Sequence, residues 1–247
     1  MPLESEQIQK LLSPVPCISV SPDAAVARAV ALMSEEHLSS TMVVEDGILV
    51  GIFTERDFLN RVAAAGLSPV TTLVKEVMTH EPSALKATDS VGDAIHLMAN
   101  RGFRNVPIVN DAGGPVGVLR VREVIAHLAF QLRRVDSSEA STFDTESQAA
   151  LQALGKVPVQ SLTQGKGAPA RVYQTDPIRE ALMMMRDRKV GAVVVENSQA
   201  DICGIFTERD VIVRLAGTDM SLEAPVMTVM TPDPIRLLTS FTVSAAL

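Results

Sequence analysis

The sequence lacks the features that would place the chain in a membrane or outside the cell. No apolar run reaches the roughly 18 residues that a membrane-spanning helix needs. Residues 1–9 contain Glu4 and Glu6 and lack the basic and then apolar pattern of a secretory signal. Cysteine is scarce, with only Cys17 and Cys203 in 247 residues, each in an apolar, strand-like context. These absences predict a cytoplasmic protein whose two thiols are buried and not joined in a disulfide.

Signals for a nucleic acid, a metal or catalysis are equally scarce. The net charge of −7 is not offset by a basic cluster, which argues against a nucleic-acid-binding surface. The four histidines stand singly, without metal-ligand spacing, and no Gly-x-Ser-x-Gly motif is present. Residues 165–170 resemble a dinucleotide-binding loop, but no apolar strand precedes them and Pro169 would interrupt the following helix. We therefore interpret residues 165–170 as a linker and expect no catalytic residues, no metal and no cofactor.

What the sequence does contain is a repeat. The residues Gly-Ile-Phe-Thr-Glu-Arg-Asp occur at 51–57 and again at 204–210, and a weaker copy lies at 117–123. Gly-Ile-Phe is typical of the end of a strand, and Thr-x-x-Asp is typical of the start of a helix, here continuing over 58–65 and 211–216. Identical residues over such a length are very improbable by chance, so these stretches mark a repeated unit.

Each marker belongs to a unit of strand, helix, strand, strand and helix, which makes the fold class α/β. In the first unit, Ser21-Pro22-Asp23 predicts the start of the first helix, and Asp46-Gly47 predicts a hairpin turn. The apolar residues of the first helix in each unit have the i, i+3, i+4, i+7 spacing of a buried face. These residues are Val26, Ala29, Val30 and Met33, then Val91, Ala94, Ile95 and Met98, and then Ile178, Ala181, Leu182 and Met185.

The units divide the chain into two pairs. We expect a lead-in helix at 1–14, a first pair at 15–134 (units about 15–66 and 75–134), an acidic linker and helix at 135–156, and a second pair at 157–247. The second pair contains a unit at about 157–217 and the beginning of a fourth from about 226, because Met230-Thr231 repeats Met78-Thr79 and a helical pattern restarts at Val243. The fourth unit stops in mid-helix, which predicts a fragment of a longer protein or a shortened chain.

Together these features resemble the cystathionine-β-synthase (CBS) domain. The resemblance rests on the Met-Thr leaders, the first helix that ends in Met, the Val-Pro-Ile-Val strand at 106–109 and the Gly-Ile-Phe-Thr-x-x-Asp ending. It covers nearly the whole chain and implies β-α-β-β-α units with small mixed sheets, paired into Bateman modules. It also implies a non-catalytic regulatory module that binds an adenosine-containing ligand, which is AMP, ADP, ATP or S-adenosylmethionine.

The Thr and the Asp of the marker are the candidate ligand residues. Backbone N–H groups at a helix start favour an anion, and a Thr hydroxyl there can donate to a phosphate oxygen. An Asp one turn further can accept hydrogen bonds from the two hydroxyls of a ribose, and a bond to an ionised group contributes roughly 1.5–3 kcal/mol. The resemblance assigns these roles to Thr54 and Asp57, and to Thr207 and Asp210.

A capping box is the alternative explanation of Thr-x-x-Asp, and it stabilises a helix start by about 0.5–2 kcal/mol. The repeat favours the ligand role, although one Thr can serve both. The second unit departs from the pattern, since Arg120 replaces the Thr and Glu123 replaces the Asp. Either this site is empty because Arg120 fills it, which we favour, or Arg120 turns toward phosphates at the neighbouring site.

The resemblance places the base of the ligand against the leader of the partner unit and the entry to its middle strand. For the site with Asp57 these residues are Thr79, Ser83, Ala84, Phe103 and Arg104. Phe103 either stacks on a purine or belongs to the core, and Arg104 faces either a phosphate or solvent. For the site with Asp210, Thr231 and Ile235 are present, but the middle strand of the fourth unit is missing. We therefore expect the Asp57 site to be the more intact.

The expected mechanism is a difference in ligand affinity between two arrangements of the units, which controls an effector protein or an attached domain. The resemblance also implies a homodimer formed through the helical faces, with no membrane and no nucleic acid as partner. Two other classes of function stay open. One is a scaffold whose units pair but bind no ligand, and the other is the regulatory region of an enzyme whose catalytic domain lies outside residues 1–247.

Overall fold

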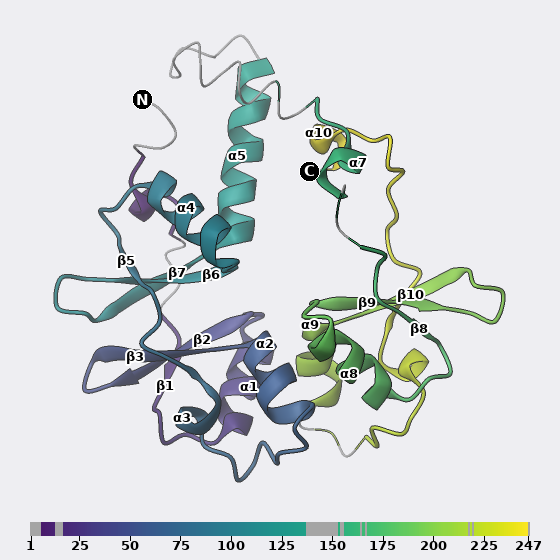
Figure 1. Cartoon of the computed structure of the whole chain (residues 1–247). Helices are drawn as coiled ribbons and strands as arrows, with labels where there is room; N and C mark the ends of the chain where they lie inside the picture. The colour runs from purple at the N-terminus through teal and green to yellow at the C-terminus, as the bar shows by residue number, and fades with distance from the viewer. Residues whose placement is uncertain are drawn as a thin grey trace. The chain divides into compact units, whose positions relative to one another are not determined.

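The computed structural model describes residues 6–12, 17–136, 153, 156–163, 165, 167–216, 218 and 220–246. They belong to two compact units, which are described separately (Figure 1). The first-and-third unit comprises residues 18–82 and 167–235 and holds the first and third repeats. The second-and-fourth unit comprises the described residues of 1–17, 83–166 and 236–247 and holds the second repeat and the beginning of the fourth. The pairing of the first repeat with the second remains a prediction.

The first repeat is a mixed sheet with helices packed against it. Its strands, in order across the sheet, are β1 (Ser19–Val20), β2 (Ser40–Glu45), β3 (Ile48–Thr54) and β4 (Thr79–His80). Strand β1 is parallel to β2, and the other neighbouring strands are antiparallel. The helices are α1 (Val26–Glu35), α2 (Glu55–Asp57), the π-helix η3 (Phe58–Ala63) and α3 (Val74–Val77).

The third repeat has the same arrangement in the same unit. Its strands are β8 (Arg171–Tyr173), β9 (Ala192–Glu196), β10 (Ile202–Thr207) and β11 (Thr231–Pro232). Its helices are α8 (Ile178–Asp187), α9 (Glu208–Asp210), the π-helix η4 (Val211–Leu215) and the 3-10 helix η5 (Val226–Thr228). One hydrophobic core joins both repeats, so that Met33 and Phe53 are buried in the same cluster as Met185 and Phe206.

The second-and-fourth unit contains the sheet of the second repeat. Its strands are β5 (Leu85–Lys86), β6 (Asn105–Val109) and β7 (Pro115–Arg120), in that order. Its helices are η2 (Ile8–Lys10), α4 (Val91–Arg101), α5 (Val121–Asp136), α7 (Val159–Thr163) and α10 (Val243–Ala246). Ile8, which precedes the second repeat by more than a whole unit, lies in the core of this repeat with Met98 and Leu119.

The predicted apolar faces are confirmed. All the face residues of α1 and α8 are buried, and in α4 only Ile95 is partly rather than fully buried. Two helix predictions are wrong in detail. The first helix begins at Val26, because its first N–H groups bond to carbonyls of residues 69–72, and Ser21-Pro22-Asp23 forms a turn instead. The helices after the markers are π-helices, and they end at Ala63 and Leu215.

Each repeat is completed by a leader, a short segment that precedes a different repeat in the sequence. The four leaders are residues 6–12, 72–80, 156–163 and 224–232. In every repeat the first backbone N–H of the first helix donates to a leader carbonyl: Val26 to Thr72 (2.9 Å), Val91 to Glu6 (2.7 Å), Ile178 to Ala224 (2.9 Å) and Val243 to Val157 (2.8 Å). Such an N–H has no partner within its helix, so the leader satisfies a donor that folding would otherwise bury unpaired. The first and second repeats exchange leaders, and so do the third and fourth.

The marker glycines allow the leaders to approach closely. A Cβ on Gly51 would lie less than 3.0 Å from the Sδ of Met78, and a Cβ on Gly204 equally close to the Sδ of Met230. These are the methionines of the two Met-Thr leaders, which continue into β4 and β11 beside the same strands. At Gly117 the side chain of Leu12 takes this place, 3.4 Å from a Cβ, which is an ordinary contact. The glycine of the marker is therefore explained by packing in two copies and not in the third.

Some predictions concern residues outside the described ranges, namely most of the acidic linker and helix (137–152 in particular) and Leu247. The lead-in helix at 1–14 is described only as η2, in which Ile8 is buried. Cys17 and Cys203 form no disulfide, as predicted, but both are half-buried rather than buried. None of the described helices combines the length and the apolar character that crossing a membrane requires.

Candidate ligand-binding site

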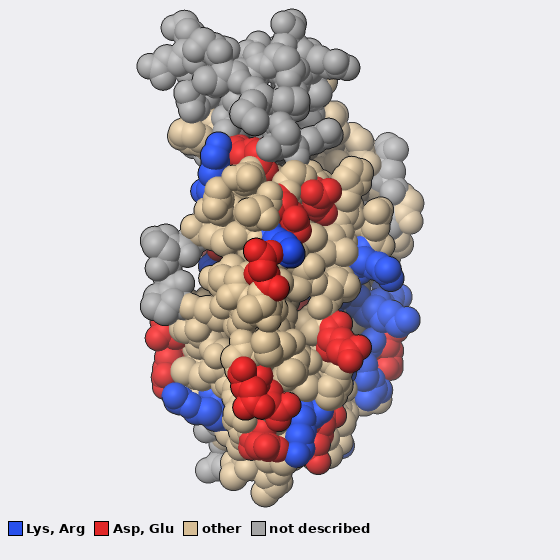
Figure 2. Space-filling model, turned by 90° about the vertical axis from the view of Figure 1, so that its left-hand side faces the viewer, with Lys and Arg blue, Asp and Glu red and all other residues tan. Residues whose placement is uncertain are grey.

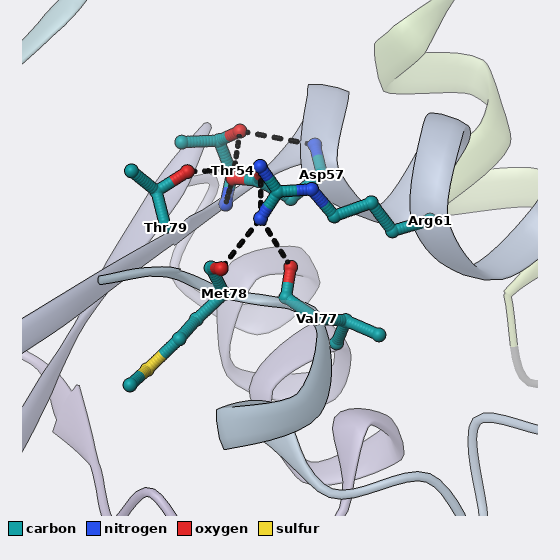
Figure 3. A network of polar contacts seen from close by, with 6 residues as sticks. All are labelled: Thr54, Asp57, Arg61, Val77, Met78 and Thr79. Atoms are coloured by element: carbon teal, nitrogen blue, oxygen red, sulfur yellow. Dashed lines mark hydrogen bonds and ion pairs between the residues drawn. The ribbon is translucent and has the colours of Figure 1, made fainter.

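Thr54 and Asp57 form a reciprocal polar contact where β3 ends and α2 begins (Figure 3). The backbone N–H and the hydroxyl of Thr54 both donate to Asp57 Oδ2, over 3.0 and 2.7 Å. The backbone N–H of Asp57 donates back to Thr54 Oγ1 over 3.1 Å. The capping box is therefore confirmed, and the ligand role of these two residues remains a prediction.

The other carboxylate oxygen of Asp57 faces the leader and the following helix. The Thr79 hydroxyl donates to Oδ1 over 3.2 Å, and Arg61 Nη1 lies 3.3 Å from the same oxygen. Arg61 Nη1 also donates to the carbonyls of Val77, over 2.9 Å, and Met78, over 2.5 Å. Figure 3 shows that the guanidinium lies between the carboxylate and these two carbonyls. One nitrogen thus connects Asp57 to the residues that directly precede Thr79.

Asp57 is an unusual carboxylate because it is 7% exposed. Burial raises the pKa of Asp57, while the hydrogen bonds from Thr54, the charge of Arg61 and the hydroxyl of Thr79 act in the opposite direction. The charged form of Asp57 therefore depends on donors that surround it. Any group that adds or removes such a donor will change how strongly Asp57 holds a proton.

The same surroundings occur at Asp210, which is 6% exposed. The N–H and hydroxyl of Thr207 donate to Asp210 Oδ2 over 2.8 and 2.7 Å, and the Thr231 hydroxyl donates to Oδ1 over 3.1 Å. Arg214 Nη1 lies 3.3 Å from Oδ1 and donates to the carbonyls of Val229 and Met230. Within the first-and-third unit the two carboxylates have equivalent partners. The expectation that the Asp57 site is the more intact concerns other residues and remains a prediction.

In the altered marker of the second repeat, Arg120 and Glu123 contact each other. The backbone N–H of Arg120 donates to Glu123 Oε2 over 2.9 Å, and its Nη1 lies 3.4 Å from Oε1. Both side chains are largely covered, with 18% and 21% of their surface exposed. Arg120 therefore pairs with Glu123 of its own marker, and both alternatives for this site, that Arg120 fills it or turns toward phosphates at the neighbouring site, remain predictions.

The remaining predicted residues lie elsewhere in the fold. Ser83 and Ala84 follow β4, while Phe103 and Arg104 lie between α4 and β6. All four belong to the second-and-fourth unit, so their approach to Asp57 remains a prediction. Phe103 is 37% exposed, so the alternative that it belongs to the core is wrong. Ile235 is 97% exposed and takes no part in the cluster around Asp210.

Sequence reasoning missed the charged partners of the two aspartates. Arg61 and Arg214 each stand four residues after the Asp, and the triplet Val-Met-Thr that receives them occurs at 77–79 and 229–231. The recurrence of both the Arg and the triplet was the signal in the sequence that could have revealed this contact. Glu55 and Arg56, inside the marker, were also left without a role, although they recur at 208–209.

The charge on the surface is mixed. On the face shown in Figure 2, acidic and basic side chains are both present, and several basic ones lie close together along the right-hand edge of the view.

The fold and the repeated Thr-Asp cluster define a protein built from exchanged β-α-β-β-α repeats. The family model described as the CBS domain matches residues 9–64, 74–129 and 168–217, more than half of the sequence, and the chain therefore belongs to the CBS-domain family. The predicted α/β fold, of the kind that pairs into Bateman modules, is confirmed.

Individual relatives support the same assignment. The chain is 27% identical to the Meiotically up-regulated gene 70 protein of Schizosaccharomyces pombe, over 94% of this chain and 38% of that protein. It is 24% identical to the CBS domain-containing protein CBSCBSPB3 of Arabidopsis thaliana, over 94% of this chain and 45% of that protein. The chain thus spans less than half the length of these two relatives.

Among solved structures, protein MJ1225 of Methanocaldococcus jannaschii, described as a putative archaeal homolog of g-AMPK, is similar in fold. The match covers 97% of this chain and 87% of that one, with a TM-score of 0.77 and 18% sequence identity. At this identity the likeness concerns the fold alone.

Proposed function

We propose that this chain is a non-catalytic regulatory module that binds an adenosine-containing ligand at Asp57 and Asp210. The observation that carries the proposal is the duplicated cluster: a buried carboxylate with a Thr on one oxygen, and a Thr and an Arg on the other. A capping Asp usually lies in solvent, as Asp93 does at the start of α4. Burial in both copies costs stability, which a purely capping role does not require.

The carboxylate chemistry suits a ribose. An ionised carboxylate has about four acceptor sites and no donor. In the structure Asp57 receives two bonds from Thr54, one from Thr79 and the charge of Arg61. The two hydroxyls of a ribose can take over acceptor sites that the Thr79 and Thr54 hydroxyls occupy. Thr54 would then be able to turn its proton toward a phosphate.

The test is thermal unfolding with AMP, ADP, ATP and S-adenosylmethionine. A ligand at about 100 times its dissociation constant stabilises the native state by roughly 2.7 kcal/mol, which is roughly 5–10 °C for a chain of this size. We expect one adenosine ligand to give such a shift, and Asp57→Ala and Asp210→Ala to reduce it. The 2′-deoxy form of that ligand should bind more weakly, because it lacks one hydroxyl of the diol.

Asp93→Ala is the matched control. It removes a capping box of the same geometry from a solvent-exposed helix start, so it should lower the melting temperature and leave the ligand response intact. No shift with any of these ligands, or an equal shift in the double variant of Asp57 and Asp210, would overturn the proposal in favour of a scaffold.

The regulatory output is the second part of the proposal. Ligand binding would change the relative stability of two arrangements of the repeats and so act on an effector protein or an attached domain. The greater length of the matched relatives supports an attached domain as one form of that output. We also expect a homodimer formed through helical faces, which light scattering of the purified chain will test.

A further inference from the structure

Arg61 makes more contacts than an exposed ion pair requires. Its side chain is 46% exposed, yet Nη1 alone contacts Asp57 Oδ1 and the carbonyls of Val77 and Met78. Val77 is the last residue of α3, so the carbonyls belong to the end of a helix, where a cation is favourable. The guanidinium therefore holds three oxygen atoms from two different segments around one nitrogen.

The third repeat contains the same arrangement independently. Arg214 Nη1 contacts Asp210 Oδ1 and the carbonyls of Val229 and Met230. In both repeats the residue after the second carbonyl is the Thr that donates to the same carboxylate oxygen. The position of the Arg, the two carbonyls and the Thr is thus reproduced as a set.

The second repeat lacks this set where it also lacks the Thr-Asp pair. The position four residues after Glu123 is His127, whose Nε2 lies 2.9 Å from Glu6 Oε2. The leader that packs there contributes Leu12 in place of a methionine. An Arg that served only to hold a leader would be equally useful in all three repeats. Its restriction to the two repeats with a buried Asp ties it to the carboxylate.

Within the described part of the chain, the other charged groups near Asp57 are engaged elsewhere. From its own helical segment, Glu55 and Arg56 pair with Arg209 and Glu208. From the leader, the group that faces Asp57 is the uncharged hydroxyl of Thr79, and the neighbouring His80 is exposed. Among the residues that the structure describes, Arg61 is accordingly the cation that acts on this carboxylate.

We propose that Arg61 and Arg214 are positioning residues, which hold the carboxylates of Asp57 and Asp210 in one orientation and at a fixed distance from the leader. The inference rests on the proposed function, in which Asp binds the ribose and the leader contacts the base. Because one guanidinium contacts both the Asp and the leader, the distance between the ribose-binding and base-binding parts of the site is set before the ligand arrives. This reduces the conformational ordering that binding requires.

The experiment has two readouts, made on Arg61→Gln, Arg61→Lys and the wild type. The first is the titration of the Asp57 carboxyl carbon followed by NMR in the protein alone, with Asp57→Asn to assign the signal. Arg61 lowers the pKa of Asp57 in the wild type, so Arg61→Gln should move the titration to higher pH and Arg61→Lys should largely restore it. The second is the affinity for AMP, measured by calorimetry over a series of pH values from acid to neutral.

We expect Arg61→Gln to weaken AMP binding at neutral pH by about tenfold, the equivalent of one hydrogen bond to a charged group. Binding to the ionised Asp should also be lost at a higher pH than in the wild type. Arg61→Lys should restore the pH profile and recover only part of the affinity, because an ammonium cannot reproduce the planar guanidinium. Arg101→Gln, on the exposed end of α4, is the control and should change neither readout.

Each outcome decides between the possibilities. A lower melting temperature in Arg61→Gln, with unchanged AMP affinity and an unchanged Asp57 titration, would show that Arg61 merely caps α3 and would overturn the inference. If the wild type binds no adenosine ligand, the proposed function fails, while the Asp57 titration still tests the positioning role without any ligand. An Asp57 titration that does not move in Arg61→Gln overturns that role in either case.

Discussion

Arg56 Nε donates to Glu208 Oε1 over 3.0 Å, which joins the marker of the first repeat to the marker of the third. The reverse contact is also present, because Arg209 Nη1 lies 3.4 Å from Glu55 Oε1. Both glutamates are buried, with Glu208 4% exposed and Glu55 9% exposed. The two inner residues of Thr-Glu-Arg-Asp are therefore identical in both copies because each copy pairs with the other.

Removing Arg56 should destabilise the first-and-third unit. Arg56→Gln leaves the buried Glu208 carboxylate with less compensation, and we expect a loss of about 1 kcal/mol, since the arginine itself is partly exposed. For a chain of this length that lowers the melting temperature by roughly 2–4 °C. The double variant Arg56→Gln with Glu208→Gln should lose less stability than the losses of the two single variants added together.

Lys75→Gln provides the comparison for this experiment. Lys75 pairs with Asp23 over 2.6 Å, but both partners are exposed to solvent, with 49% and 67% of their side-chain surface accessible. Thermal unfolding of this variant should be indistinguishable from that of the wild type. If Arg56→Gln also leaves the melting temperature unchanged, the contact between the markers contributes nothing to stability.

Replacing the marker glycines by alanine should destabilise the protein to a different extent in each of the three repeats. Gly51→Ala and Gly204→Ala force the buried Met78 and the partly buried Met230 to move, and overpacking of this kind costs about 1–3 kcal/mol. Gly117→Ala meets Leu12 at an ordinary distance and should have a much smaller effect. Chemical denaturation of the three variants will rank them, and a cost at Gly117 equal to that at Gly51 would contradict this explanation.

The contributions of Asp57 and Asp93 to stability should change in opposite directions as the pH rises, although both residues belong to a capping box. Burial raises the pKa of Asp57 above its usual value of 3.8. Its contribution to stability is therefore fully present below 3.8 and is lost as the pH rises through the raised pKa. The hydrogen bonds from Ser90 lower the pKa of Asp93, so its contribution is present above 3.8 and is lost as the pH falls through the lowered pKa.

The measurement is the free energy of unfolding against pH for the wild type, Asp57→Asn and Asp93→Asn. Subtracting each variant from the wild type isolates the contribution of one carboxyl group. The two difference curves should slope in opposite directions in the acid range. Curves of the same slope would show that burial does not govern Asp57.

Thr54 should stabilise the protein through its hydroxyl. Thr54→Ala removes both the acceptor for the Asp57 N–H and a donor to its carboxylate, with an expected cost of about 1 kcal/mol. Thr54→Ser keeps the hydroxyl and should retain most of that stability. Equal melting temperatures for Thr54→Ala and Thr54→Ser would contradict the capping role.

The sequence predicted the helices and their buried faces because those depend on local periodicity. The faces of α1 and α8 follow from apolar spacing alone, and the marker follows from the recurrence of residues. The start of α1 at Val26 was missed because it is set by Thr72, which lies outside the local pattern. Arg61 was missed for a related reason, since an Arg on a short helical segment looks like an ordinary solvated side chain until its carbonyl partners are known.

The exchange of leaders determines which piece of this chain can exist by itself. The segment that recurs in the sequence, from Val26 through the marker, lacks both the carbonyl that caps its first helix and the edge strand that covers its glycine. A gene duplication that copied one such segment would therefore yield a copy unable to close its own core. Such a copy would depend on a leader from another part of the chain to cap its first helix, as each repeat here does.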